Sequence, residues 1–528
     1  METRRFNVTG VCVPDKHYMV DISGKVRQIR AMIDQGLYFT INRGRQYGKT
    51  TTINALCGAL ADDYICVWIS LEGLGRASFE TEEAFCPVFL RLVQRALHFT
   101  SVAGETAYIE RWMDPSVKDF VALNDHLSTM CEGRKIVLMI DEADAFISLR
   151  TYLSFLGLLR DKYLKRSTGR DFTFQSVILA GVVDIRNIKM KMIKEGIYTP
   201  AAQENTDHIS PWNIAAPFDV DMSFHPAEIA TMLSEYEADH HTGMDIAGIA
   251  EEIYRWTSGY PFLVSRICML IDGSAEKKWN NEGIFHAVKL LLDERNTLFD
   301  DIFKNMEMYQ DLYDYVYDIL IRGAEKAYSP YNPTLSWALM FCFLKVADGK
   351  VLVHNRVFEL CICDYFMSRE DDRSRRQTMQ SGVLKHDVVR EGRFDMELAL
   401  RKFARHFRTI YTERDADFFE RHGRLLFLSY LAPLINGDGF YHIESQLTNL
   451  QRMDIVVNYG RDEFVIELKL WRGETAREDA LTQLAGYLAG RGASAGYLVT
   501  FDLRQEPHRT PKEEWVEAGP CRIFDVVL

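Results

Sequence analysis

The chain has 528 residues, of which 47% are hydrophobic and 26% charged, and a formal net charge of −13. This length exceeds what a single hydrophobic core normally serves, and the composition is that of globular protein, so we expect three or four domains. The acidic balance excludes a protein that binds nucleic acid through its overall charge. Any contact with DNA must therefore come from local groups of basic residues.

The cysteines and the apolar runs indicate the compartment. The ten cysteines are scattered, and Cys361 and Cys363 stand too close together for a zinc knuckle, so we expect reduced thiols. Residues 1–14 contain no long apolar stretch, and no run approaches the roughly 20 apolar residues of a membrane helix. We therefore expect a cytoplasmic protein with no membrane partner.

The predicted elements begin with an α/β region at residues 1–221. Short apolar runs are candidate strands, and the longer amphipathic stretches between them are candidate helices. Strands that are buried on both faces and separated by helices are typical of a parallel sheet. The predicted strands are 37–41, 65–70, 135–140 and 176–180, and the predicted helices are 49–61, 80–97, 117–131 and 152–163.

Helices dominate the middle of the chain. Residues 222–300 open with Ser223 as a candidate helix cap. Residues 301–368 add helices and an Asp-Gly turn between two short strands at 344–353, which indicates a winged helix. The basic residues around this hairpin fit a contact with the DNA backbone and, equally, a lid that docks protein. Residues 369–393 are predicted to be a charged linker, and residues 394–528 return to mixed α/β pattern.

A glycine-containing loop separates the first predicted strand from its helix. Backbone N–H groups of such a loop wrap a polyphosphate, a lysine adds positive charge, and a Ser or Thr reaches Mg²⁺. Gly48, Lys49 and Thr50 supply the last three positions, but Arg43 stands where the pattern has glycine. An ordinary strand–helix turn is the alternative. The predicted nucleotide-binding residues are Arg43, Gly44, Arg45, Gln46, Tyr47, Gly48, Lys49, Thr50, Thr51 and Asp141.

A second apolar strand delivers two acids, Asp141 and Glu142, at its carboxyl end. Ligands of open α/β sheets bind at the carboxyl ends of the strands, so both acids are expected beside the loop. We predict that Asp141 and Thr50 hold Mg²⁺, and that Glu142 orients or deprotonates the attacking water as a catalytic residue. A buried strand that simply ends at a surface turn is the alternative.

With these motifs in place, residues 1–370 resemble the AAA-ATPase-like proteins of bacteria and archaea. The matching features are the Arg-rich run from Arg43 to Thr50, the strand that ends in Asp141 and Glu142, and a Gly-Tyr-Pro turn at 259–261. The resemblance implies ATP and Mg²⁺ as cofactors and allows a homo-oligomer. It also implies that Asp184 or Asn187 senses the γ-phosphate and that Arg266 reaches the nucleotide.

A carboxylate cluster near the far end indicates different chemistry. Metal-dependent cleavage of a phosphodiester needs carboxylates that hold Mg²⁺ and a cation that stabilises the transition state. One predicted strand offers Asp454, and the next offers Glu467 and Lys469, which share a face because they are two residues apart. A hairpin would bring the two strands together. The alternative is an exposed charge pair without catalytic function.

The order Asp–x₁₂–Glu-x-Lys, followed by Gln483 and Tyr487 on a helix, resembles the PD-(D/E)XK nuclease superfamily in its RecB-type branch. The resemblance implies a restriction-endonuclease-like domain that uses Mg²⁺ or Mn²⁺ on DNA. Glu420, or Glu444 and Gln446, would add a further acid or amide. The predicted catalytic residues are Glu142, Glu420, Asp454, Glu467, Lys469, Gln483 and Tyr487, with Asp454 and Glu467 as metal ligands.

Both motifs together predict a P-loop AAA-type ATPase with helical lid and winged helix, joined to an α/β nuclease domain. The ATPase-family resemblance implies phage or mobile-element defence. Two alternatives remain open: an ATP-driven oligomeric switch whose last domain only binds nucleic acid, and a signalling ATPase that docks proteins. The predicted domains are 1–221, 222–300, 301–368, 369–393 and 394–528.

Overall fold

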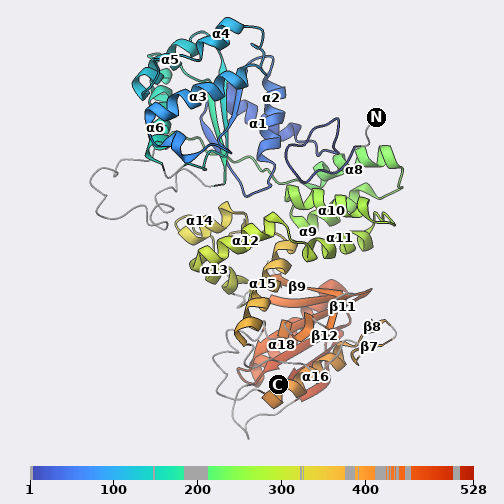
Figure 1. The fold of residues 1–528 in the computed structure, drawn as a ribbon. Helices are drawn as coiled ribbons and strands as arrows, with labels where there is room; N and C mark the ends of the chain where they lie inside the picture. Colours follow the sequence, from blue (N-terminus) through green and yellow to red (C-terminus); the bar gives the residue numbers. More distant parts are fainter. Residues whose placement is uncertain are drawn as a thin grey trace, which may run out of the picture. The chain divides into compact units, whose positions relative to one another are not determined.

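The computed structural model describes residues 4–146, 149–182, 212–321, 324, 326–374, 387–390, 392–410, 439–445, 453–502 and 512–528, with short pieces between 424 and 435. The chain forms two compact units (Figure 1). The first comprises Met1–Asp293 and the short segment Met340–Cys342. The second comprises Glu294–Leu339 and Phe343–Leu528. Each unit is described separately below.

The first unit contains a four-stranded parallel sheet in the order β1-β4-β3-β2. The runs that form it are buried along nearly their whole length, as expected for strands covered on both faces. Phe39 also forms a parallel bridge with Ala216 on the open side of β1. The parallel sheet predicted from the strand–helix alternation is therefore confirmed. The strands are β1 (Phe39–Asn42), β2 (Ile65–Ser70), β3 (Ile136–Asp141) and β4 (Ser176–Gly181).

Helices cover both faces of this sheet (Figure 1). On one face, α3, α5 and α6 share a hydrophobic core with alternate residues of β2, β3 and β4. On the other, α2 follows β1 and buries Ile53, Leu56 and Leu60. The helices of this region are α1 (Ser23–Asp34), α2 (Lys49–Leu60), α3 (Glu82–Leu97), α4 (Thr106–Arg111), α5 (Phe120–Cys131) and α6 (Arg150–Ser167).

A group of four helices completes the first unit. Ser223 was expected to cap the first of them, but that prediction is wrong: His225 is the N-cap, and its N–H donates to Glu228 at 2.8 Å. Pro226 takes the first helical position, where its missing N–H costs nothing, so the cap must be the residue before it. The helices are α8 (Pro226–His240), α9 (Ile246–Thr257), α10 (Pro261–Gly273) and α11 (Asn281–Asp293).

The second unit begins with helices and one hairpin. The hairpin predicted at 344–353 is confirmed, with β5 and β6 antiparallel and Asp348 and Gly349 both at positive φ. The helix after it extends to Ser374, so residues 369–374, expected in the linker, continue a helix. The winged-helix assignment stays a prediction. The elements are α12 (Thr297–Met308), α13 (Gln310–Leu320), α14 (Pro333–Met340), β5 (Leu344–Ala347), β6 (Lys350–Val353) and α15 (Arg356–Ser374).

A six-stranded mixed sheet ends the chain, in the order β13-β14-β12-β11-β10-β9. Its central strands β11, β12 and β14 are parallel, whereas β9, β10 and β11 form an antiparallel meander. The helix α18 connects β11 to β12 and packs its apolar side on one face of the sheet. The elements are β7 (Val389–Arg390), β8 (Arg393–Phe394), α16 (Met396–Ile410), β9 (Gly439–Ser445), β10 (Met453–Tyr459), β11 (Asp462–Leu470), α18 (Glu474–Arg491), β12 (Ala495–Phe501), β13 (Lys512–Ala518) and β14 (Cys521–Val527).

Candidate functional sites

The loop between β1 and α2 contains two residues with a positive φ, Gln46 and Gly48. Gly48 caps α2 with φ 78°, a left-handed conformation that glycine adopts without strain. Gln46 also has a positive φ of 55°. In the anion-binding loops known as nests, such turns point successive N–H groups toward one anion, and this loop leads directly into the N-terminus of α2. The loop therefore offers donors to an anion at the carboxyl end of β1.

Lys49 is buried in this loop with 7% of its surface exposed. Its Nζ donates to the carbonyl oxygens of Arg43 at 3.0 Å and Gly44 at 2.9 Å. Burial lowers the pKa of Lys49, and the nearby acids Glu142, Asp144 and Asp141 oppose that shift. The ammonium is thus held inside the loop by neutral carbonyls, which a more strongly charged acceptor could replace.

Thr50 and Asp141 lie 91 residues apart in the chain and meet at this site. Thr50 Oγ1 donates a hydrogen bond of 2.8 Å to Asp141 Oδ2. Asp141 ends β3 and is buried, with 4% of its surface exposed. A hydroxyl and a carboxylate side by side are oxygen donors of the kind Mg²⁺ prefers, so these two residues fit the ion that the motif implies.

Glu142 follows Asp141 in an unusual backbone conformation. Its φ is 52°, and its N–H donates to Asp141 Oδ1 at 3.0 Å. Burial raises the pKa of Glu142, and the neighbouring Asp144 raises it further. A non-glycine residue at positive φ is held there by its surroundings, and such outliers cluster at functional sites. Glu142 thus combines a positive φ with a carboxyl group whose pKa is raised by burial.

The other predicted loop residues have varied surroundings. Arg43 donates to the carbonyl oxygens of Asn42 and Val220, each at 2.9 Å, so its guanidinium binds backbone. Arg45 and Gln46 are exposed, and Tyr47 is buried. Thr51 Oγ1 accepts from the N–H of Cys12 at 3.3 Å.

Two residues at the loop were missed by sequence reasoning. Tyr260, just before α10, donates from its hydroxyl to the carbonyl oxygen of Arg45, and its ring lies 4.7 Å from that of Tyr47. Cys342 Sγ accepts from the N–H of Gly44 at 3.4 Å. The Gly-Tyr-Pro turn at 259–261 was a usable signal for Tyr260, whereas no pattern pointed to Cys342. Arg266, predicted to reach the nucleotide, donates to Met269 Sδ at 3.0 Å, and Asp184 and Asn187 lie outside the described residues.

In the last sheet, Glu467 and Lys469 lie on the same face of β11. Lys469 Nζ is 2.9 Å from Glu467 Oε1, and Glu467 is buried with 2% of its surface exposed. Alternation along β11 places both on the face of Val465, which packs against α18. The predicted pairing of these two side chains is thus present in the structure.

The backbone register places two further acidic residues, Asp454 and Glu444, level with Glu467 on the neighbouring strands. Asp454 pairs with Glu444 of β9, and the Ile455–Ile466 pair places position 454 opposite position 467 when extended by one residue. Glu444, Asp454 and Glu467 therefore occupy neighbouring positions on three strands. Among the residues whose side chains the structure describes, no group of three or more His, Cys, Asp or Glu is arranged to hold a metal ion. Glu420 and Gln446 lie outside the described residues.

The helix residues of the predicted nuclease motif lie on α18. Gln483 is exposed, and Tyr487 is half-buried against the core under the helix. The Tyr487 hydroxyl accepts from Arg491 at 2.6 Å, and Arg491 also reaches Glu463, which lies four residues before Glu467 on β11. Tyr487 is thus held toward the beginning of β11, while Lys469 lies near the end of that strand.

A buried ion pair beside this face was also missed. Arg477 of α18 donates through Nε to Asp525 Oδ2 at 2.7 Å, and Asp525 is fully buried. Burial raises the pKa of Asp525, and Arg477 opposes the shift. In the parts of the chain that are described, Asp525 Oδ1 and Thr500 Oγ1 have no hydrogen-bond partner. The spacing of Arg477 and Asp525 in the sequence follows no known motif, so this ion pair is recognised only from the folded structure.

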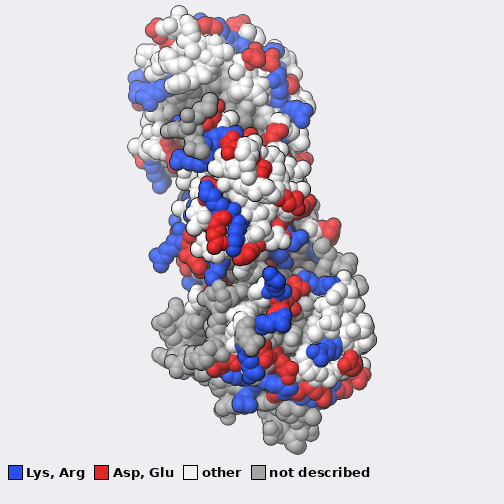
Figure 2. Space-filling model, turned by 90° about the vertical axis from the view of Figure 1, so that its right-hand side faces the viewer, with Lys and Arg blue, Asp and Glu red and all other residues white. Residues whose placement is uncertain are grey.

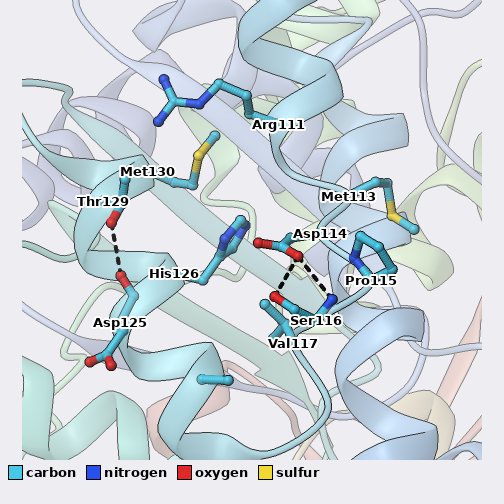
Figure 3. A pocket seen from close by; sticks show the side chains of 11 residues that line it. Arg111, Met113, Asp114, Pro115, Ser116, Val117, Asp125, His126, Thr129 and Met130 are labelled. Atoms are coloured by element: carbon cyan, nitrogen blue, oxygen red, sulfur yellow. Dashed lines mark hydrogen bonds between the residues drawn. The ribbon is translucent and has the colours of Figure 1, made fainter.

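A separate hollow of about 580 Å³ lies between α5 and the segment after α4 (Figure 3). His126 and Asp114 face each other in its centre, and Asp114 accepts hydrogen bonds from the N–H and hydroxyl of Ser116. Burial lowers the pKa of His126. None of the residues that line this hollow belongs to the loop between β1 and α2 or to the strand β3.

The surface shows no large field of one sign on the face drawn in Figure 2, where Lys, Arg, Asp and Glu are interspersed. Near the hairpin, His354 and Asn355 are buried, and Asn355 Oδ1 accepts from the N–H of Phe358 at the start of α15. These two residues therefore serve the fold. Within the described residues, no helix is both long and apolar enough to cross a membrane, and all ten cysteines are free.

Comparisons with known proteins find remote similarity. No family model matches the chain. An uncharacterised WD repeat-containing protein of Synechocystis is 22% identical over 369 residues, which make up 65% of this chain and 29% of that protein. The chain thus spans less than a third of that relative's length.

Two solved structures are similar over most of their own length. A Walker-type ATPase of Pyrococcus abyssi aligns with a TM-score of 0.43 at 13% identity, covering 68% of this chain and 99% of that one. The ORC2 protein of Aeropyrum pernix, in its ADPNP–ADP form, aligns with a TM-score of 0.35 at 12% identity, covering 70% and 98%.

Proposed function

We propose that the first unit binds and hydrolyses ATP. The observation that supports this most is the hydrogen bond of 2.8 Å between Thr50 and Asp141, which joins the phosphate loop to the acid strand. Neither residue alone identifies an ATPase, because Gly-Lys-Thr turns and strands that end in acidic residues are both common. Their contact, with Lys49 and Glu142 beside it, is the arrangement that hydrolysis of a phosphoanhydride needs.

Each residue of the site has a task in this reaction. The N–H groups of the loop and of the first turn of α2 take the polyphosphate. Lys49 exchanges the carbonyl oxygens of Arg43 and Gly44 for phosphate oxygens, which are stronger acceptors. Glu142, whose pKa is raised by burial, accepts a proton from the attacking water more readily than an exposed glutamate would.

Thr50 and Asp141 would hold Mg²⁺ in this site. When bound, the ion would neutralise the charge on the phosphate oxygens during transfer. Without it, the Thr50 hydroxyl keeps the Asp141 carboxylate oriented at the end of β3.

The test compares Lys49→Ala with a control lysine in the same unit. Lys135→Ala is suitable, because Lys135 is exposed and lies outside the site. Binding of a fluorescent ATP analogue and release of phosphate would be measured for the purified chain. We expect Lys49→Ala to abolish turnover and Lys135→Ala to leave it unchanged. Equal turnover in all three proteins would contradict the proposal.

For the second unit we propose metal-dependent cleavage of DNA. The favouring observation is the Lys469–Glu467 pair of 2.9 Å on the face that bears the Glu444–Asp454–Glu467 row of backbone positions. A buried carboxylate beside a lysine suits a metal ion and the charge of a phosphodiester transition state. Asp454, Glu467 and Lys469 are the proposed catalytic residues, and Gln483 and Tyr487 are proposed to assist from α18.

Cleavage would be tested on linear, nicked and single-stranded DNA with Mg²⁺ or Mn²⁺, with and without ATP. Lys469→Ala should abolish cutting, while Lys512→Ala, a control lysine of β13 that is paired with Glu474, should not. Dependence on ATP would indicate that the two activities are coupled. No metal-dependent cutting under any condition would favour the alternative, an ATP-driven switch whose last domain only binds nucleic acid. A DNA contact by the hairpin, a homo-oligomer and a defence role stay predictions.

A further inference from the structure

We infer that Cys342 is a positioning residue of the phosphate loop, and that the segment Met340–Cys342 forms a latch which nucleotide binding opens. This inference builds on the proposed ATPase function. The latch is defined as these three residues, which pack with the first unit although the residues just before and after them belong to the second. Met340 is also the last residue of α14, and Cys342 lies two residues before the start of β5.

The latch holds the loop through close contacts at Gly44. Cys342 Sγ accepts the N–H of Gly44 at 3.4 Å. A Cβ placed on Gly44 would lie 3.0 Å from the carbonyl oxygen of Phe341 and 3.3 Å from the Tyr260 hydroxyl, so no larger residue fits there without movement. Met340 packs against the hydrophobic core under the sheet. The three latch residues thus each lie against the loop or the core of the first unit, to which they belong.

The backbone of the latch is strained at Cys342. Cys342 has a φ of 58° and is buried with 6% of its surface exposed. A non-glycine residue at positive φ persists only while its contacts hold it there. Loss of the Gly44 contact would therefore let Cys342 relax to an ordinary conformation, which favours opening.

Lys49 connects this latch to the nucleotide. Its ammonium now binds the carbonyl oxygens of Arg43 and Gly44, and so fixes the same peptide whose N–H Cys342 accepts. When Lys49 moves to the phosphates of ATP, Gly44 loses that restraint and its peptide is free to shift. Because linkage is reciprocal, weakening the latch must in turn tighten nucleotide binding by the same factor.

The test measures how accessible the thiol of Cys342 is to an alkylating reagent, because opening of the latch would expose this thiol. The full chain is pulsed with iodoacetamide, and alkylation of the peptide that contains Cys342 is followed by mass spectrometry. Cys268, fully buried in α10, is the internal reference. With Mg²⁺ and a non-hydrolysable ATP analogue we expect Cys342 to react at least three times faster, and Cys268 at an unchanged rate. Lys49→Ala should show no acceleration.

The reciprocal measurement uses two variants of Cys342. Cys342→Ala removes the acceptor and should bind the analogue two to five times more tightly, lowering KM for ATP with little effect on kcat. Cys342→Ser restores an acceptor and should return to the affinity of the wild-type chain. Binding of the analogue without any change in Cys342 alkylation would overturn the latch alone. Failure of the wild-type chain to bind the analogue would overturn the ATPase proposal and the latch with it.

Discussion

The hydroxyl of Thr50 lies 2.8 Å from a carboxylate oxygen of Asp141 and donates a hydrogen bond to it. Both oxygens are proposed to hold Mg²⁺, so removing one should lower hydrolysis more than binding. We expect Thr50→Ala to reduce kcat for ATP by about 100-fold, the scale for losing one group that stabilises transition-state charge. Thr50→Ser keeps the hydroxyl and should retain most activity. Full activity in Thr50→Ala, measured by phosphate release, would show that this hydroxyl has no part in catalysis.

Tyr260 is expected to stabilise the conformation of the loop between β1 and α2, although it lies outside that loop in the sequence. Its hydroxyl donates to the carbonyl oxygen of Arg45, and its ring packs against Tyr47. Tyr260→Phe keeps the ring contact and loses one hydrogen bond, so the free energy of unfolding should fall by about 1 kcal/mol. KM for ATP should rise several-fold because the loop is less ordered. Tyr254→Phe, six residues earlier in α9, is the matched control and should change neither quantity.

Glu142 should make the stability of the first unit depend on pH. Its folded-state pKa is raised by burial and by Asp144. The stability that such a group contributes is present below the unfolded pKa, about 4.3, and is lost as pH rises through the folded pKa. Glu142→Gln removes the charge of this half-buried side chain, so we expect a higher melting temperature than wild type at pH 7.5. The difference should shrink at pH 4, and a constant difference across this range would argue against a raised pKa.

Removing only one member of the buried ion pair Arg477–Asp525 should lower the stability of the protein strongly. Arg477→Met leaves the Asp525 carboxylate fully buried without its cation, and the free energy of unfolding should fall by about 3–5 kcal/mol. Removing both charges in Arg477→Met with Asp525→Leu should recover much of that loss.

The pH dependence of the same variants gives a second check. Because burial raises the pKa of Asp525, acid neutralises the carboxyl at the pH where an unfolded aspartate is still charged. The penalty of Arg477→Met should therefore be smaller at pH 4 than at pH 7 in urea unfolding. An equal penalty at both values would mean that Asp525 stays ionised in the variant.

Most of the first site was predictable from sequence, because its residues follow local rules. Gly48, Lys49 and Thr50 lie in one turn, and Asp141 and Glu142 end one apolar strand, so periodicity and the rule for strand ends place all five together. The same holds for Glu467 and Lys469, which share a face because they alternate along β11.

The remaining features depend on contacts that no local pattern encodes. Cys342 and Gly44 are 298 residues apart, and Arg477 of α18 meets Asp525 of β14 where the helix packs on the sheet. Ser223 failed as a cap for a local reason, since Pro226 sets where α8 begins. The helix through residues 369–374 was missed because its charged run lacks an apolar stripe, although its first turns are buried.

The most direct test of the central claim is ATP hydrolysis by Glu142→Gln beside the wild-type chain, with binding of the ATP analogue measured on the same samples. Glutamine keeps the size of the side chain and loses the base. We predict that the variant binds the analogue as tightly as wild type and hydrolyses ATP at least about 100-fold more slowly. Unchanged hydrolysis in the variant, or no hydrolysis by the wild-type chain, would contradict the account of this site as an ATPase.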